Sequence, residues 1–324
     1  MLDVRNLSIS INRGRDCFAV ADGIDITLNA GEIIALAGES GCGKTLTALS
    51  IMQLLPPAAG ISGGEILFSG GRETVNLCSL DEESLCEIRG KEIAMIYQEP
   101  GQSLNPLMKI GVQIGEALRL HGADEKTAGI AALDMLRKLK FAEPEKIFNS
   151  RPHQLSGGMC QRVMIAAAAI CRPRLLIADE PTAALDTETQ GHILGLLKQI
   201  NREFGTAILF ITHDLAIARQ FCSRLLVMYS GKIIEEGPVE ILFSAPAHPY
   251  TNGLIGATPR KENRNQPLAN IPGVMPSIEN RLSGCPFAPR CPKVQERCRL
   301  AFPPETDLSS GHIVHCFLSG AGHD

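Results

Sequence analysis

A glycine-rich run that ends in a lysine and a hydroxyl side chain is the segment best suited to phosphate chemistry. Residues 38–45 read Gly-Glu-Ser-Gly-Cys-Gly-Lys-Thr and fit the pattern G-x-x-x-x-G-K-[ST]. Glycines let backbone N–H groups turn around phosphates, Lys44 can reach the β- and γ-phosphates, and the Thr45 hydroxyl can ligate Mg²⁺. The residues expected to hold a nucleotide here are Gly38, Ser40, Gly41, Cys42, Gly43, Lys44 and Thr45.

Two carboxylates follow an apolar run further along the chain. Residues 175–180 read Leu-Leu-Ile-Ala-Asp-Glu, which places Asp179 at the carboxyl end of a predicted strand, where nucleotides bind in open α/β sheets. Asp179 is the expected partner of Mg²⁺. Glu180 can polarise a water for attack on the γ-phosphate, because a carboxylate within hydrogen-bond reach can accept the proton. Without the phosphate run upstream, the pair would be interpreted as charges at a helix N-terminus.

Strands and helices must position these residues. Short runs rich in isoleucine, leucine and valine alternate with helical patterns, which predicts a mostly parallel sheet with helices on both faces. The predicted strands are residues 32–37, 92–97, 174–178, 206–211 and 224–229. A helix over 46–55 is expected after the phosphate run. Partial alternation in 2–11 and 24–28, and a turn at Gly63-Gly64 before 65–68, predict a small antiparallel sheet beside the main one.

Proline distribution divides the chain. Eleven of the 20 prolines come after residue 244, whereas residues 182–237 contain none. We therefore expect a nucleotide-binding domain over 1–244 and an extension over 245–324. Within the first domain the strand pattern fades after residue 100, and 126–140 places apolar residues at helical spacing, which predicts an inserted helical subdomain over about 100–170.

Composition excludes several classes of protein. Of 324 residues, 44% are hydrophobic and 20% are charged, which is ordinary for a globular chain and excludes disorder throughout. Apolar stretches are too short to span a membrane, and residues 1–5 do not begin a secretory signal, so a cytoplasmic location is expected. A formal charge of −4 with mixed signs argues against nucleic acid as a partner.

Further motifs resemble those of one known family. Residues 155–162 read Leu-Ser-Gly-Gly-Met-Cys-Gln-Arg and resemble the signature motif of ATP-binding cassette (ABC) proteins. In the same order along the chain, Gln98 resembles the Q-loop glutamine, Ala184-Leu185-Asp186 resembles the D-loop, and His213 resembles the switch histidine. The resemblance implies an α/β fold, a P-loop NTPase of ABC type with a flanking antiparallel β-subdomain, an inserted helical subdomain and a Cys/Pro-rich C-terminal extension.

The signature residues carry a physical argument of their own. Ser156, Gly157 and Gly158 lie at a predicted helix N-terminus, an anion site that phosphates held at Lys44 of the same chain do not fill. We expect two cassettes packed head to tail, with ATP sandwiched between them. The D-loop resemblance adds Asp186 to the residues that are expected to bind the nucleotide. Read alone, Ser-Gly-Gly would be interpreted as a helix cap.

Three further residues are assigned roles beside the phosphates. His213 can donate to the γ-phosphate and hold the water of Glu180 in line. Gln98 is expected to sense Mg²⁺ or water and to link the site to the helical subdomain. Phe18 is the candidate for stacking on adenine, with Cys17 marking an alternative register and a place in the core as the other interpretation.

The end of the chain resembles one group of subunits within this family. His248-Pro249-Tyr250-Thr251, residues 273–276 and a cysteine-rich end resemble the extension of ABC subunits that power dipeptide and oligopeptide importers. This implies a homologous ATPase partner in a heterodimer, two membrane permeases, an extracytoplasmic peptide-binding protein and a peripheral place on the cytoplasmic face of the membrane. A nickel or other small-solute importer, or a soluble ABC protein of translation or DNA repair, remains an alternative.

Four cysteines near the end are spaced as a ligand set. They are Cys285, Cys291, Cys298 and Cys316, separated by five, six and seventeen residues. Four thiolates can hold Zn²⁺ or an iron–sulfur cluster. The gaps lack the C-x₂-C pairs usual for zinc, and the resemblance implies a 4Fe-4S cluster; zinc and free thiols stay open. A proline-rich segment has little core of its own, so such a site would be structural, with redox regulation as the alternative.

Overall fold

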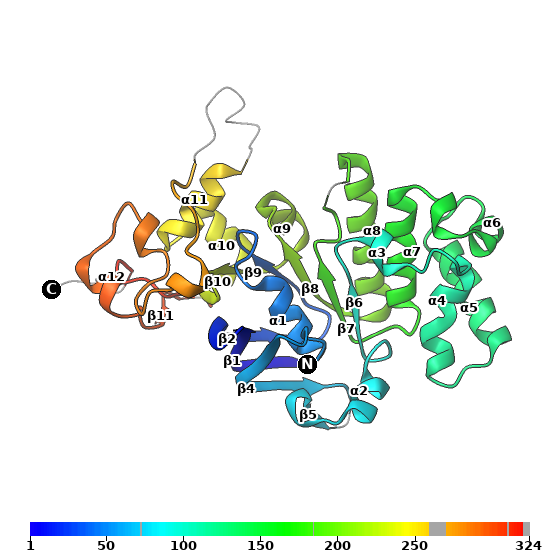
Figure 1. The fold of residues 1–324 in the computed structure, drawn as a ribbon. Helices are drawn as coiled ribbons and strands as arrows, with labels where there is room; N and C mark the ends of the chain where they lie inside the picture. The colour runs from blue at the N-terminus through cyan, green and yellow to red at the C-terminus, as the bar shows by residue number, and fades with distance from the viewer. Residues whose placement is uncertain (72, 184, 259–269, 310, 320–324) are drawn as a thin grey trace.

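The fold is described from a computed structural model of residues 1–324, in which all residues are described except 72, 184, 259–269, 310 and 320–324. Ala184 of the expected D-loop therefore lies outside the described residues. Two sheets stand one above the other, and helices cover the larger one (Figure 1).

The larger sheet has the strand order β11-β12-β10-β9-β3-β8-β7-β6. Its strands are β3 (Ile33–Ala37), β6 (Ile93–Ile96), β7 (Leu175–Asp179), β8 (Ala207–Thr212), β9 (Arg224–Tyr229), β10 (Lys232–Pro238), β11 (Thr306–Asp307) and β12 (Ile313–Val314). The pairs from β9 to β6 are parallel, as the sequence predicts, and the pairs from β9 to β11 are antiparallel. The carboxyl ends of β3, β6, β7 and β8 therefore share one edge, where the predicted nucleotide residues follow.

The smaller sheet is antiparallel, with the order β2-β1-β4-β5. Its strands are β1 (Leu2–Arg13), β2 (Asp16–Leu28), β4 (Ala59–Ser69) and β5 (Thr74–Asn76). The expected turn at Gly63-Gly64 is wrong, because β4 runs through both glycines. The β1–β4 register shifts between Arg5 and Ser8, and a Cβ on Gly64 would lie 2.4 Å from the Asn6 carbonyl oxygen. The glycines accommodate an irregular close approach of two strands.

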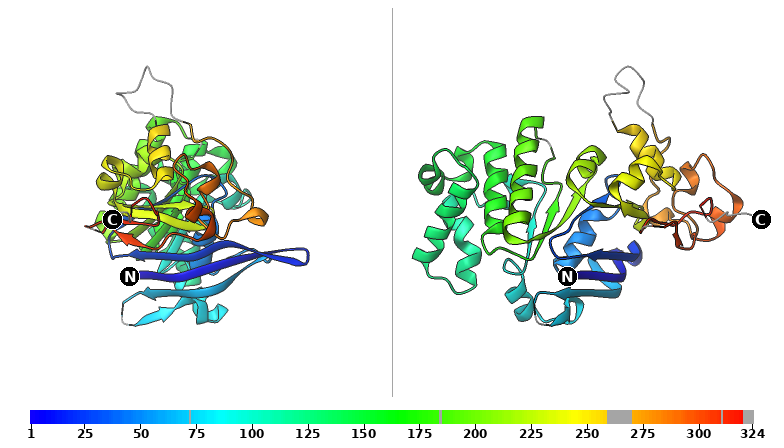
Figure 2. Two further views of the ribbon diagram at one scale, coloured as in Figure 1. Left: turned by 90° about the vertical axis from the view of Figure 1, so that its left-hand side faces the viewer. Right: turned by 180° about the vertical axis from the view of Figure 1, so that it is seen from behind.

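Helices surround the larger sheet. Their bounds are α1 (Lys44–Ile51), α2 (Glu82–Ile88), α3 (Pro100–Ser103), α4 (Ile110–Leu120), α5 (Glu125–Lys138), α6 (Pro144–Asn149), α7 (Gly157–Ala169), α8 (Thr187–Phe204), α9 (Leu215–Phe221), α10 (Val239–Ser244), α11 (Pro249–Ala257) and α12 (Glu296–Leu300). Figures 1 and 2 place α4–α6 at one end of the molecule and α12 at the opposite end. The phosphate run therefore lies between the helical insertion and the extension.

Alternate residues of β3 enter two hydrophobic cores. Ile34 and Leu36 pack with α1 and the antiparallel sheet, whereas Ala35 and Ala37 pack on the side of α7 and α8. A strand buried on both faces reads as a continuous apolar run, which is why the run of residues 33–37 was recognisable in the sequence.

The described part of the extension packs into a core that it shares with the first domain. Phe287 is 2% exposed and belongs to the same core as α7, α8 and the central strands. Strand β12 pairs with β10, with Glu235 opposite Val314 and Glu236 opposite Ile313. The segment described after residue 244 is therefore held by the sheet and the core of the first domain, in addition to any ligand that its cysteines bind.

Candidate nucleotide site

The phosphate loop connects β3 to α1 at the shared edge of the parallel strands. Two of its glycines are required by their surroundings. A Cβ on Gly38 would lie 2.1 Å from the Met228 carbonyl oxygen, and Gly43 has φ of 116° with no room for a side chain beside Met228 Cε. The close approach of β9 to both positions leaves room for glycine alone, and α1 begins directly after Gly43.

Lys44 is buried at the start of α1. It is 5% exposed, and its Nζ donates to the carbonyls of Gly38 at 2.8 Å and Glu39 at 3.0 Å. A cavity of about 300 Å³ opens beside it. The cavity is lined by Val20, Ser40, Gly41, Gly43, Lys44, Thr45, Leu46, Gln98 and Glu180. Its volume suits a small-molecule ligand, and five of the predicted phosphate residues line it.

Asp179 ends β7 with a buried oxygen that has no partner. The residue is 3% exposed, and its Oδ1 makes no hydrogen bond. Burial raises the pKa of the Asp179 carboxyl, and the Glu180 carboxylate raises it further, while a hydrogen bond with Thr45 and the charge of Lys44 lower it. A buried acidic oxygen without a partner, beside a hydroxyl and Gln98, fits Mg²⁺, which binds through one or two carboxylates in phosphate sites.

Glu180 lies between the other two predicted catalytic side chains. Its Oε2 accepts a hydrogen bond of 3.1 Å from Gln98 Nε2, and His213 Nδ1 lies 3.2 Å from the same oxygen. The Glu180 side chain is 13% exposed, and its backbone φ of 46° is uncommon for a residue other than glycine. The structure therefore brings Gln98, Glu180 and His213 together at the cavity edge.

The signature residues are in a different place. Ser156 begins α7, where its hydroxyl accepts from the Met159 N–H at 3.3 Å, and neither it nor Gly157 or Gly158 lines the Lys44 cavity. Ser156 and Gly157 are exposed. Asp186 caps α8 in the same way through the N–H of Thr189. Within one chain, Ser156 therefore acts as a helix cap. Because Ser156 is exposed, a second chain can reach it.

Phe18 does not line the cavity. It is half-buried on β2, and Cys17 beside it is exposed. Val20, which lies at a shift in the β1–β2 register, does line the cavity, so β2 contributes Val20 and not Phe18 to the cavity wall. Phe18 is also absent from both buried cores. Adenine stacking on Phe18 remains a prediction.

The sequence matches the ABC transporter family over residues 21–183, which include the phosphate loop, Gln98, the signature residues and both carboxylates. The chain belongs to this family. It is an ABC ATPase, whose substrate is ATP with Mg²⁺. Residues 234–298 also match the C-terminal region of oligopeptide and dipeptide transporters.

Relatives and solved structures agree with this membership. A probable peptide ABC transporter ATP-binding protein of Sinorhizobium fredii is 44% identical over 322 residues, covering 98% of this chain and 95% of its own. The oligopeptide transport ATP-binding protein of Haemophilus influenzae is 43% identical, with 98% and 97% covered. A dimeric ATP-binding cassette solved with ADP and phosphate superposes with a TM-score of 0.65 at 28% identity, covering 74% of this chain and 99% of that one.

The four cysteines of the extension lie near one another. Burial, helped by the charges of Cys298, Cys316 and Cys291, raises the pKa of Cys285 to about 11. The Cys285 N–H donates to the Cys298 carbonyl at 2.8 Å. Over the described residues, however, no group of three or more cysteine, histidine or acidic side chains is arranged to hold a metal ion. The donor chemistry fits a metal, but this structure gives the expected metal site no geometric support.

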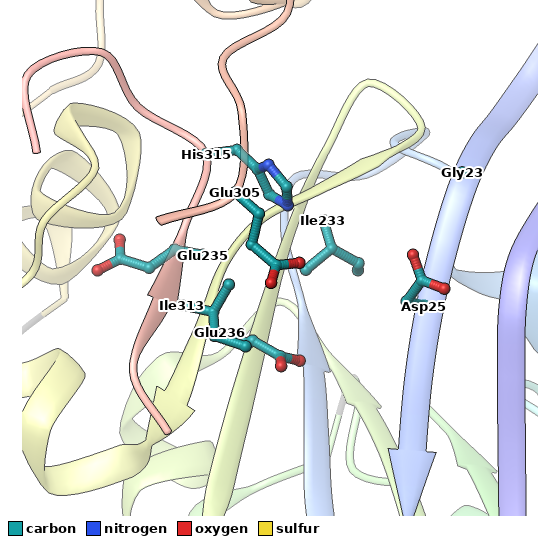
Figure 3. A pocket seen from close by; sticks show the side chains of 8 residues that line it. All are labelled: Gly23, Asp25, Ile233, Glu235, Glu236, Glu305, Ile313 and His315. Atoms are coloured by element: carbon teal, nitrogen blue, oxygen red, sulfur yellow. The ribbon is translucent and has the colours of Figure 1, made fainter. Parts of the chain in front are cut away.

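A smaller pocket lies where the extension meets β2 and β10 (Figure 3). It is lined by Gly23, Asp25, Ile233, Glu235, Glu236, Glu305, Ile313 and His315. Burial raises the pKa of Glu236, Arg224 lowers it, and the charges of Glu305 and Asp25 raise it. Figure 3 shows Glu235 pointing away from Glu236 and Glu305. Glu235 instead accepts from His312 Nε2 at 2.7 Å and from the His248 N–H at 3.0 Å, which joins the extension to β10.

Sequence reasoning missed the residues of the extension that contact the phosphate loop. Arg290 and Tyr250 both contact Glu39, over 200 residues away in sequence. Glu39 occupies a position that the phosphate-loop pattern leaves open. Tyr250 lies inside a motif that the resemblance singled out, but no spacing rule connects it to Glu39.

Proposed function

We propose that this chain is the ATP-hydrolysing subunit of an importer of dipeptides and oligopeptides. The observation that carries the proposal is the match of residues 234–298 to the C-terminal region of oligopeptide and dipeptide transporters. Relatives over nearly the whole length carry peptide-transport names, including a dipeptide transport ATP-binding protein of Bacillus subtilis at 42% identity. ATP binding closes a head-to-tail pair of cassettes, and ATP hydrolysis releases the pair.

The site residues divide this work among them. The phosphate loop and Lys44 bind the β- and γ-phosphates, while Thr45, Asp179 and Gln98 hold Mg²⁺, which neutralises phosphate charge when bound. Glu180 accepts the proton of the attacking water, and His213 holds the γ-phosphate in line. The orphaned Asp179 Oδ1 and the convergence of Gln98 and His213 on Glu180 support these roles.

The second half of the site comes from another cassette. Ser156, Gly157 and Gly158 offer the N-terminus of α7 to the phosphates bound by the partner, with Asp186 at the same contact. The exposure of Ser156 and its absence from the Lys44 cavity support this arrangement. A homologous but different ATPase as the partner, giving a heterodimer, follows from the resemblance to peptide importers.

A groove beside Gln98 is the proposed contact with a membrane permease. Among the described residues, no helix combines the length and apolar composition that a membrane span requires. The groove is lined by α4, α7, β6 and the segment that follows α1, and Leu54, Tyr97 and Leu120 in it are 39%, 40% and 79% exposed. Exposed apolar side chains beside a catalytic glutamine fit a segment of a permease that reports on ATP. The chain would then be peripheral on the cytoplasmic face of the membrane, with an extracytoplasmic peptide-binding protein on the other side.

The experiment is reconstitution of the chain with its permeases, partner ATPase and binding protein in lipid vesicles. ATP-dependent uptake of labelled di- and oligopeptides, lost in Glu180→Gln, is the expected result. Uptake of nickel or another small solute in place of peptides would show that the substrate assignment is wrong while the ATPase role stands. Failure to copurify with any membrane subunit would favour a soluble ABC protein.

The groove has its own matched control. Leu120→Asp places a charge in the groove, whereas Ile130→Asp places one at another exposed apolar position, 56% exposed on α5. Copurification with the permeases should fall only for Leu120→Asp. Equal copurification of both variants would exclude this groove as the permease contact.

We further propose that Cys285, Cys291, Cys298 and Cys316 bind a metal centre, with a 4Fe-4S cluster as the form that the resemblance implies. The mutual electrostatic influence of their thiols supports it. Iron, sulfide and zinc content with a visible spectrum, on protein purified without oxygen, is the test. Iron and sulfide lost on replacing these cysteines support the cluster, zinc identifies a zinc site, and no metal leaves free thiols.

A further inference from the structure

Glu39, the second residue of the phosphate loop, is attached to the extension at two points. Its N–H donates to the Tyr250 hydroxyl at 3.0 Å, and its carboxylate accepts from Arg290 Nη1 at 3.0 and 2.9 Å. Its carbonyl accepts from Lys44 Nζ at 3.0 Å. One residue therefore connects Arg290 in the extension to the lysine that faces the cavity.

Arg290 is itself held firmly. It ends the 3₁₀ turn η5 (Ala288–Arg290), and its side chain is 6% exposed. Nε donates to the Pro272 carbonyl at 2.9 Å, and Nη2 donates to the Ile271 carbonyl at 3.3 Å. Nη1 also donates to the Tyr229 hydroxyl at 3.2 Å. A planar guanidinium fixed at three nitrogens presents Glu39 with a donor of defined position.

An aromatic cluster packs against the contact between Arg290 and Glu39. Tyr229 and Tyr250 are fully buried, with ring centroids 4.6 Å apart, and Phe287 of the extension lies 5.3 Å from each. These edge-on and tilted ring contacts fix both hydroxyls that meet Glu39 and Arg290. Elsewhere, Arg281 Nη2 donates to the Val20 carbonyl at 2.6 Å, and Val20 lines the cavity. The extension thus contacts both the phosphate loop and the β2 side of the nucleotide cavity.

Structural stabilisation alone is the simplest alternative. A buried ion pair is weak grounds for stability, because desolvation offsets its attraction. The position of Glu39 indicates a role in nucleotide binding, because its backbone belongs to the loop that turns N–H groups toward phosphates. The solved cassette bound to ADP is covered to 99% of its length by 74% of this chain, so the extension is additional to a complete cassette. The phosphate loop here is therefore supported from outside the cassette.

We propose that Arg290 is a positioning residue for ATP binding, which holds the phosphate loop through Glu39 from the C-terminal extension. The proposal rests on the phosphate-binding role proposed above for residues 38–45. Loop N–H groups contact the phosphates before and during hydrolysis alike. Loosening the loop therefore weakens binding in both states and raises KM for ATP with little change in kcat.

The test is a double-mutant cycle in the full-length chain. Arg290→Ala, Glu39→Ala and the double variant are compared by the dissociation constant for ATP and by KM and kcat of hydrolysis. Each single variant should raise the dissociation constant and KM about fivefold or more with kcat within about twofold. The double variant should be no weaker than the worse single one, because both remove the same contact. Arg290→Lys, which keeps the charge toward Glu39, should recover part of the loss.

The controls separate this role from a structural one. Glu279→Ala removes the Arg13–Glu279 ion pair of 2.6 Å, an exposed contact between the extension and β1, and should leave KM unchanged. A lower melting temperature for Arg290→Ala with unchanged KM, or fully additive effects in the cycle, would overturn the proposal. If Arg290→Ala does not fold, Glu39→Ala carries the test, because Glu39 is 29% exposed. Lys44→Ala must abolish ATP binding; if it does not, the phosphate-loop assignment fails, independently of Arg290.

Discussion

Gln98 Nε2 donates a 3.1 Å hydrogen bond to Glu180 Oε2, although the two residues are 82 positions apart in the sequence. Each follows a strand of the larger sheet, β6 or β7, and these strands are parallel neighbours. His213, which follows β8 on the other side of β7, approaches the same oxygen to 3.2 Å. The sheet order therefore gathers a glutamine and a histidine from two separate motifs around the carboxylate of a third, Glu180.

Replacing Glu180 by glutamine tests the proposed base. An amide keeps the size of the side chain but does not accept the proton of the attacking water. ATP binding should persist and the cassette dimer should accumulate with ATP, while hydrolysis falls by about 10²-fold or more. ATP turnover and size-exclusion chromatography with ATP measure the two effects. Glu203→Gln, at the exposed end of α8, is the matched control, and a wild-type rate for Glu180→Gln would show that another group is the base.

Asp179→Asn separates metal binding from stability. Burial raises the pKa of Asp179, so the charged form is disfavoured in the folded protein without Mg²⁺. Removing that charge should keep or raise the melting temperature in the presence of a chelator. The Mg²⁺ concentration for half-maximal hydrolysis should rise about tenfold or more, because Asn is a weaker ligand for a hard cation. Unchanged Mg²⁺ dependence would remove Asp179 from the metal site.

Ser156→Asp distinguishes a helix cap from a phosphate contact. Aspartate caps helices as well as serine does, so the stability of the chain should change by less than about 1 kcal/mol. ATP binding by the isolated chain should also persist, because Ser156 does not line the Lys44 cavity. A negative charge facing the partner's phosphates should abolish ATP-driven dimerisation, measured by light scattering with the partner cassette. Normal dimerisation would leave Ser156 as a cap alone.

Much of the site could be predicted because its signals are local. The phosphate loop is one continuous run, and Glu180 directly follows a strand that ends in Asp179 and whose residues are all buried. A strand buried on both faces and a glycine loop each carry their pattern within a few residues. The predicted strands of the parallel sheet are confirmed within about two residues at their ends for the same reason.

The rest depends on contacts that no local pattern records. Arg290 meets Glu39 across 251 positions, and β12 adds to the sheet after an extension that reads as irregular and proline-rich. Gly63-Gly64 reads as a turn because two glycines favour one, yet the approach of Asn6 decides that β4 continues. In each case the deciding neighbour is distant in sequence, so tertiary packing overrides the local preference.

The last prediction concerns acid and the docking of the extension. His248 is 2% exposed, and burial together with the charge of His315 lowers its pKa to about 3. Its Nδ1 accepts from the Tyr250 N–H at 3.0 Å, a cap for α11 that requires the neutral ring. Below its ordinary pKa of about 6.5 the unfolded chain binds a proton that the folded chain does not. The contribution of the neutral His248 ring to the free energy of unfolding is therefore complete above about pH 6.5 and is lost as the pH falls toward 3.

Denaturant unfolding between pH 7 and pH 4 measures this loss. His248 should lower the free energy of unfolding by up to about 1.4 kcal/mol for each pH unit of acidification, which corresponds to the uptake of one proton. His248→Asn should remove about that much from the slope of the free energy of unfolding against pH. Asparagine can still cap α11, so the variant should fold. His153→Asn, at an exposed position, should leave the slope unchanged; an equal slope for all three proteins would exclude His248 as the group responsible. Because α11 carries the Tyr250 hydroxyl that accepts from Glu39, acid that loosens α11 should also weaken ATP binding before the chain unfolds.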